Sequence, residues 1–103
     1  YSYGIHMSTI VAIKKRITPI LHESDVEFAG IFGSTARGKA KKNSDIDILI
    51  RFKEQKSLLE IIDLEMHLSR VLDRKVDLVT SQALCRHIRS NVLHDLQPIY
   101  GTR

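Results

Sequence analysis

The chain has 103 residues and a formal net charge of +4, with 43% hydrophobic and 27% charged residues. This length accommodates one domain with a modest core, and the composition excludes intrinsic disorder. No apolar run approaches the roughly 20 residues that cross a bilayer, and no secretory leader opens the chain. The single cysteine, Cys85, excludes an intramolecular disulfide and a CxxC metal site. We therefore expect a cytoplasmic protein without membrane association. Nothing indicates nucleic-acid binding beyond the mild positive charge.

The N-terminal part of the chain predicts one amphipathic helix. Residues 1–6 resemble a remnant of recombinant expression, with Met7 as the native start, so we expect one domain over residues 7–103. Ser8 is a suitable N-cap for a helix that runs to about Leu21. Pro19 is expected to weaken or end this helix. Its apolar stripe consists of Ile10, Ile13, Ile17, Ile20 and Leu21.

The rest of the chain alternates between predicted strands and helices. Strands are expected over residues 26–32, 45–52 and 75–79, helices over 57–72 and 81 to about 96, and a short strand over 99–100. A turn and a lysine-rich loop fill residues 34–43, and Pro98 is expected to stop the last helix. This order predicts an α/β (α+β) fold, with helices that cover a small mixed sheet of three to four strands.

The strand over residues 45–52 contains two carboxylates on one face. Because side chains alternate along a strand, Ile46, Ile48 and Ile50 share one face, and Asp45 and Asp47 share the other. If the isoleucines enter the core, the aspartates point together although their charges repel. A bound cation would relieve this repulsion, and paired carboxylates with two Mg²⁺ ions are the known arrangement for nucleotidyl transfer. The alternative is a solvated face on an edge strand.

A glycine and a serine follow the preceding strand and suggest a phosphate-binding turn. Gly33 lacks a Cβ, so a phosphate can approach its backbone, and Ser34 offers a hydroxyl group. Arg37 lies one turn further on and can reach the phosphates or pair with an aspartate. The alternatives are a plain strand-to-helix turn with a serine cap and an ordinary surface arginine.

A third carboxylate completes the candidate metal site. Asp77 stands in the otherwise apolar segment Lys75-Val76-Asp77-Leu78-Val79, which we expect to be a neighbouring strand. A two-metal site generally needs a third acidic group, and Asp77 is the best candidate. The alternative is an exposed charge on the outer face of that strand.

Taken together, these motifs resemble a known family signature. Residues 33–38, Gly-Ser-Thr-Ala-Arg-Gly, and residues 43–50, Asn-Ser-Asp-Ile-Asp-Ile-Leu-Ile, are similar to the signature of the DNA polymerase β-like nucleotidyltransferases. The short chain resembles the minimal (MNT or MntA-type) branch of that superfamily. The resemblance covers most of residues 8–103 and implies the polymerase β-like fold in a single nucleotidyltransferase domain.

The resemblance also implies a reaction and a set of site residues. The reaction is transfer of a nucleotidyl group, AMP from ATP, to a hydroxyl group with release of pyrophosphate. Two Mg²⁺ ions would serve as cofactors. The implied catalytic and metal-binding residues are Asp45, Asp47 and Asp77, and the implied nucleotide-binding residues are Gly33, Ser34 and Arg37.

Finally, the resemblance implies a protein partner. MNT proteins resemble the antitoxin of a two-gene module whose toxin is a helical HEPN ribonuclease, so we expect an antitoxin that adenylylates its HEPN toxin. A homo-oligomer is also compatible with the sequence. One alternative is a partner-binding antitoxin without catalysis, whose nucleotide site is vestigial. Another is nucleotidyl transfer to a small molecule such as an aminoglycoside.

Overall fold

The computed structural model describes residues 5–38, 44–83 and 92–102. The helices and strands in chain order are α1 (Ile5–Glu23), β1 (Val26–Phe32), α2 (Gly33–Ala36), β2 (Ile46–Phe52), α3 (Leu58–Leu72), β3 (Val76–Thr80) and β4 (Gln97–Gly101). Residues 92–95 add one helical turn before β4. In the described part of the chain, no helix is long and apolar enough to cross a membrane.

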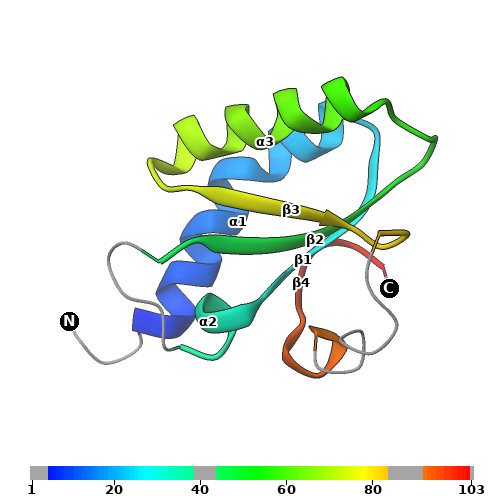
Figure 1. Cartoon of the computed structure of the whole chain (residues 1–103). Coiled ribbons are helices and arrows are strands. Elements are labelled where there is room, and N and C mark those ends of the chain that lie inside the picture. Colours follow the sequence, from blue (N-terminus) through cyan, green and yellow to red (C-terminus); the bar gives the residue numbers. More distant parts are fainter. Residues whose placement is uncertain (1–4, 39–43, 84–91, 103) are drawn as a thin grey trace.

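The four strands form one mixed sheet in the order β3-β2-β1-β4 (Figure 1). The central strand β1 is antiparallel to both β2 and β4, whereas β2 and β3 run parallel. The prediction of a small mixed sheet is therefore confirmed. Its parallel pair is joined by α3, which is the crossover that two parallel neighbours require.

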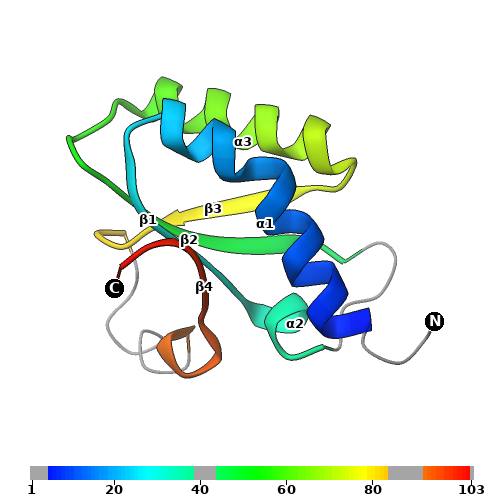
Figure 2. The same ribbon diagram turned by 180° about the vertical axis from the view of Figure 1, so that it is seen from behind.

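The main core lies between one face of the sheet and the helices α1 and α3. Ile46, Ile48 and Ile50 of β2 are at most 1% exposed and belong to this core, as the strand alternation predicts. Figure 2 shows α1 crossing the strands of the sheet and approaching α3. On the opposite face, the described residues form a smaller cluster, in which Leu49 packs with residues from the helical turn before β4. The site-bearing face of β2 is therefore the one that α1 and α3 do not cover.

Helix α1 is longer than the sequence predicts. It begins at Ile5, before the expected N-cap Ser8, and continues through Pro19 to Glu23. The expectation that Pro19 weakens or ends the helix is wrong. Ile17 and Leu21, on either side of the proline, are fully buried against the sheet. This burial offsets the cost of the missing hydrogen bond, which is about 3 kcal/mol in an exposed helix.

Helix α3 begins and ends as its sequence predicts. The Ser57 hydroxyl accepts a hydrogen bond from the backbone N–H of Glu60, and the Glu60 carboxylate accepts one from the N–H of Ser57. This reciprocal capping box satisfies two donors that the first turn would leave unpaired. At the other end, Asp73 takes a left-handed conformation with φ of 52° and turns the chain toward β3.

The outer edge of β3 is held by side chains of α3. The Ser69 hydroxyl accepts from the backbone N–H of Val76 at 3.0 Å, and the Glu65 carboxylate accepts from the N–H of Leu78 at 2.8 Å. An edge strand otherwise presents such donors to solvent or to another chain. The two bonds fix the backbone on both sides of Asp77.

The C-terminal segment departs from its prediction. Residues 81–83 form a turn, so the expected helix does not begin at Ser81, and residues 84–91 lie outside the described residues. The helical turn over residues 92–95 ends close to the expected end near Leu96, and Pro98 follows inside β4. β4 is an edge strand, where a residue without an N–H is tolerated. The predicted short strand at residues 99–100 is confirmed as part of β4.

We predict that replacing Glu65 with alanine destabilises the domain by about 1–2 kcal/mol, because the N–H of Leu78 loses its charged acceptor. Urea denaturation followed by circular dichroism measures this change. The matched control is Asp63→Ala, which removes an exposed carboxylate from the same helix. Equal stability of the two variants would contradict the proposed role of Glu65.

Candidate functional site

The two strands of the parallel pair bring Asp47 and Asp77 side by side. Asp47 of β2 is the register partner of Asp77 of β3, and neighbouring strands lie about 4.8 Å apart. Asp45 precedes β2 by one residue and is two residues from Asp47, so strand alternation places it on the same face. Asp45 and Asp77 are exposed, whereas Asp47 is half-buried. The three predicted carboxylates therefore gather at one end of the β2–β3 pair.

Asp47 experiences the charges of the other two carboxylates in addition to its own burial. Partial burial raises the pKa of Asp47 above its usual value, and the negative charges of Asp77 and Asp45 raise it further. The positive charge of Arg37 acts in the opposite direction. The ionised carboxylates therefore repel one another, and a bound cation would reduce this repulsion.

Gly33 closes the site from the side of β1. It follows Phe32, the register partner of Asp47, and has a φ of +74°. A Cβ on Gly33 would lie 2.3 Å from the Asp47 Oδ2, closer than two such atoms can approach. Glycine is thus required here both by the backbone conformation and by the aspartate. The structure brings together the predicted glycine turn and the predicted carboxylate strand.

Ser34 and Arg37 are positioned by the short helix α2. Ser34 is half-buried next to Gly33, and the backbone N–H of Arg37 donates to the Gly33 carbonyl at 3.1 Å. One helical turn therefore places the exposed arginine beside the start of α2. Its positive charge lowers the pKa of Asp47, which opposes the larger effects of burial and of the neighbouring aspartates.

The sequence did not reveal one residue of this region. Nη1 of Arg37 donates to Oδ2 of Asp95 at 2.7 Å. Asp95 lies 58 residues further along the chain, within a predicted helix. An acidic residue is ordinary in a helix, so nothing in the sequence marks Asp95 as a site residue. A weaker ion pair at 3.9 Å joins the exposed Lys75 and Asp45. The side chains of Arg37 and Lys75 are therefore basic groups at the edge of the site.

The residues present suit magnesium. Within residues 5–38, 44–83 and 92–102, no three His, Cys, Asp or Glu side chains form a ready-made metal cage. Mg²⁺ does not need such a cage, because it is bound by one or two carboxylates together with waters and substrate phosphates. Two facing carboxylates on β2 and β3, with a third beside them, provide hard oxygen ligands of this kind.

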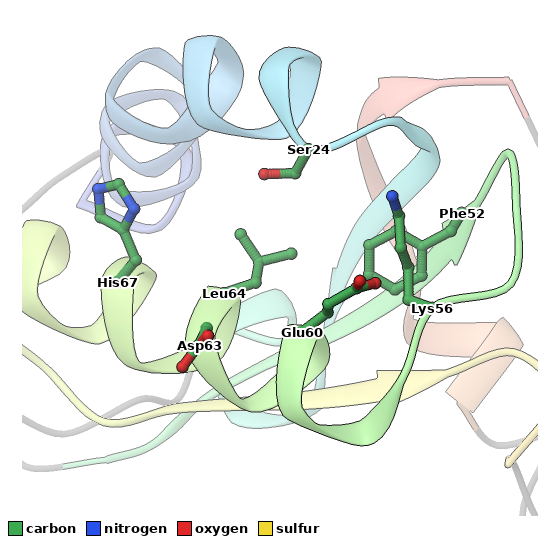
Figure 3. A pocket seen from close by; sticks show the side chains of 7 residues that line it. All are labelled: Ser24, Phe52, Lys56, Glu60, Asp63, Leu64 and His67. Atoms are coloured by element: carbon green, nitrogen blue, oxygen red, sulfur yellow. The ribbon is translucent and has the colours of Figure 1, made fainter.

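A separate pocket of about 300 Å³ lies between the end of α1 and α3. Figure 3 shows its lining, and none of the predicted site residues contributes to it. The lining residues are Ser24, Phe52, Lys56, Glu60, Asp63, Leu64 and His67. The carboxylate site therefore lies outside this pocket, on the sheet face opposite the main core.

Comparison with known proteins identifies relatives over most of the chain. Residues 15–103 match the family model "Polymerase beta, Nucleotidyltransferase". A provisionally named protein adenylyltransferase of Methanocaldococcus jannaschii is 42% identical over 83 residues, which are 81% of this chain and 89% of that protein. The protein adenylyltransferase MntA of Thermococcus cleftensis is 46% identical over 67 residues, 65% of this chain and 68% of its own.

A solved structure shares the fold as well. A crystal structure described as a toxin–antitoxin with AMP-PNP superimposes with a TM-score of 0.78 and 25% identity. The match covers 87% of this chain and 74% of that one. The nucleotidyltransferase fold expected from the sequence is confirmed.

We predict that Asp47→Asn raises the melting temperature of the metal-free protein by a few degrees at pH 7.5. A carboxyl whose pKa is raised by folding weakens the fold above that pKa and has no such effect below its unfolded value. The gain should therefore shrink as the pH falls toward 4. Scanning calorimetry in EDTA measures it, with Asp63→Asn as the control. A lower melting temperature for Asp47→Asn at pH 7.5 would contradict the prediction.

Proposed function

Because this chain belongs to the polymerase β nucleotidyltransferase family, in its minimal MntA-type branch, we propose that it transfers AMP from ATP to a hydroxyl group of a protein and releases pyrophosphate. One observation supports this most strongly. Asp47 faces Asp77 across the parallel strands, and Gly33 packs against the Asp47 carboxylate without room for a Cβ. The turn that would bind phosphate and the carboxylates that would bind metal thus lie together, which supports the proposal.

Asp45, Asp47 and Asp77 would hold two Mg²⁺ ions. Bound there, the ions lower the pKa of the acceptor hydroxyl and stabilise charge on the departing pyrophosphate. Asp47 is the least exposed of the three carboxylates and its neighbours raise its pKa, so it gains most from a cation. These features support the assignment of the three aspartates as metal ligands.

The chain's own residues orient the two substrates. Gly33 gives the triphosphate access to the backbone, the Ser34 hydroxyl is a donor beside it, and the Arg37 guanidinium neutralises phosphate charge. Asp77 belongs to the edge strand β3 and is exposed, so it lies on the side open to an acceptor. We assign it the role of accepting the proton of the attacking hydroxyl.

The acceptor that we propose is a HEPN-type toxin, and the chain is its antitoxin. Two kinds of relative support this. The sequence relatives are named protein adenylyltransferases, and the solved structure with AMP-PNP is a toxin–antitoxin. With ATP as the donor, we propose that the reaction takes place in the cytoplasm. The alternative, an antitoxin that acts by contact alone, predicts no group transfer and is separated by the experiment below.

We predict that the chain, mixed with Mg²⁺, α-labelled ATP and a HEPN protein encoded by an adjacent gene, transfers label to that protein. Asp45→Asn should lower the labelling rate at least a hundredfold, because it removes a metal ligand from the reacting groups. EDTA should abolish labelling in every sample. Gel autoradiography and intact-protein mass spectrometry measure the transfer of AMP.

The control for this experiment is Asp63→Asn, whose carboxylate lies on α3 outside the site and should leave labelling unchanged. Inhibition of the toxin that persists in Asp45→Asn, with no label on the toxin in any sample, would contradict catalysis and favour the binding module.

A further inference from the structure

An ion pair links the catalytic region to the C-terminal part of the chain. Arg37 follows α2 and its guanidinium meets the Asp95 carboxylate at 2.7 Å. The Asp95 side chain is 22% exposed and that of Arg37 is 48% exposed, so the pair lies at the border between the smaller core cluster and solvent. Such a short charge-assisted bond fixes the direction of the longer side chain.

Asp95 itself is held firmly by its neighbours. It ends the helical turn over residues 92–95, and Val92 and Leu96 on either side are buried in the cluster that contains Leu49. Gly30 of β1 makes this packing possible, because a Cβ at Gly30 would lie 2.6 Å from Leu96 Cδ1. The carboxylate is thus presented from a segment packed on the sheet. Figure 1 shows this turn on the side of the sheet opposite α3.

The backbone of Arg37 lies close to Asp47, because its N–H donates to the carbonyl of Gly33, and Gly33 lies directly against the Asp47 carboxylate. The charge of Arg37 lowers the pKa of Asp47, against the effects of burial and of the other two aspartates. An arginine without another acceptor at this place would form its hydrogen bonds with those aspartates, because guanidinium and carboxylate match in geometry and charge. It would then occupy the oxygens that the metal ions need. The bond to Asp95 supplies a different acceptor.

We propose that Asp95 is a positioning residue that holds Arg37 beside the three aspartates rather than on them, so that the guanidinium meets the triphosphate and the carboxylates stay open to Mg²⁺. This proposal rests on the proposed function, in which Arg37 contacts ATP. Because Asp95 acts only through Arg37, its loss should affect the binding of nucleotide and metal more than the rate of the chemical step.

The test compares Asp95→Asn, Asp95→Glu and Arg37→Gln with the unaltered protein. Asp95→Asn should raise the KM for ATP roughly three- to thirtyfold, which lies within the range of coupling energies between contacting residues, and change kcat less than about threefold. The Mg²⁺ concentration for half-maximal rate should rise with it. Asp95→Glu, which keeps the acceptor, should recover most of the loss.

A double variant separates positioning from folding. If Asp95 acts through Arg37, adding Asp95→Asn to Arg37→Gln should raise the KM no further. Melting temperatures of all variants show whether the domain stays folded at the assay temperature. An unchanged KM in Asp95→Asn, or the same fold-increase with and without Arg37, would overturn the proposal.

A second measurement keeps this inference distinct from the proposed function. Isothermal titration with Mg²⁺ and AMP-PNP needs no acceptor protein. If the unaltered chain binds the analogue but labels no protein, the proposed transfer of AMP is contradicted. Weaker binding of the analogue by Asp95→Asn would then still support the role of Asp95. Equal affinity of the two proteins overturns that role. Absence of any binding by the unaltered chain overturns both.

Discussion

The pairing of Asp47 with Asp77 across two parallel strands is the constraint on which the rest of the site depends. Burial of the isoleucines on one face of β2 turns Asp47 to the other face, because successive side chains of a strand point to opposite faces, and the parallel register with β3 sets Asp77 beside it. Core packing and strand register thus bring the acidic groups together. Burial, followed by the negative charges of Asp77 and Asp45, raises the pKa of Asp47. Perturbed carboxylates of this kind are common at functional sites, and this association supports the proposed role of the aspartates.

Several local features serve this pair of carboxylates. Gly33 leaves space for the Asp47 side chain, and Glu65 and Ser69 of α3 fix β3 on both sides of Asp77. An edge strand that is bonded to a helix cannot slide, so the register between the two aspartates is maintained. Asp95, in the helical turn before β4, orients the guanidinium of Arg37. Residues from α2, α3 and the C-terminal turn therefore converge on one interaction.

Much of this could be predicted from the sequence, because its main signals are local. The alternation in residues 45–52 indicates both the buried face and the acidic face, and a glycine directly after a buried strand indicates the turn. The helix over residues 57–72 carries its own capping box and apolar spacing. Asp77 was a weaker inference, because its position beside Asp47 depends on a parallel pairing that no local pattern specifies.

Other features depend on contacts between distant residues and were beyond prediction. The pair of Arg37 and Asp95 joins segments 58 residues apart, and neither residue has an unusual local context. Pro19 was expected to disturb α1, but burial of its neighbours outweighs local propensity. In the C-terminal segment, the apolar spacing that predicted a helix from Ser81 was wrong at its start, where the chain turns at residues 81–83. Tertiary packing decides each of these cases.

The central claim is that the facing carboxylates bind a metal together with a triphosphate. Titration calorimetry of AMP-PNP into the unaltered chain and into Asp77→Asn, with Mg²⁺ or with EDTA, tests it most directly. The account predicts that Mg²⁺ strengthens nucleotide binding at least tenfold in the unaltered chain and much less in Asp77→Asn. Nucleotide binding of equal strength with Mg²⁺ and with EDTA would contradict it.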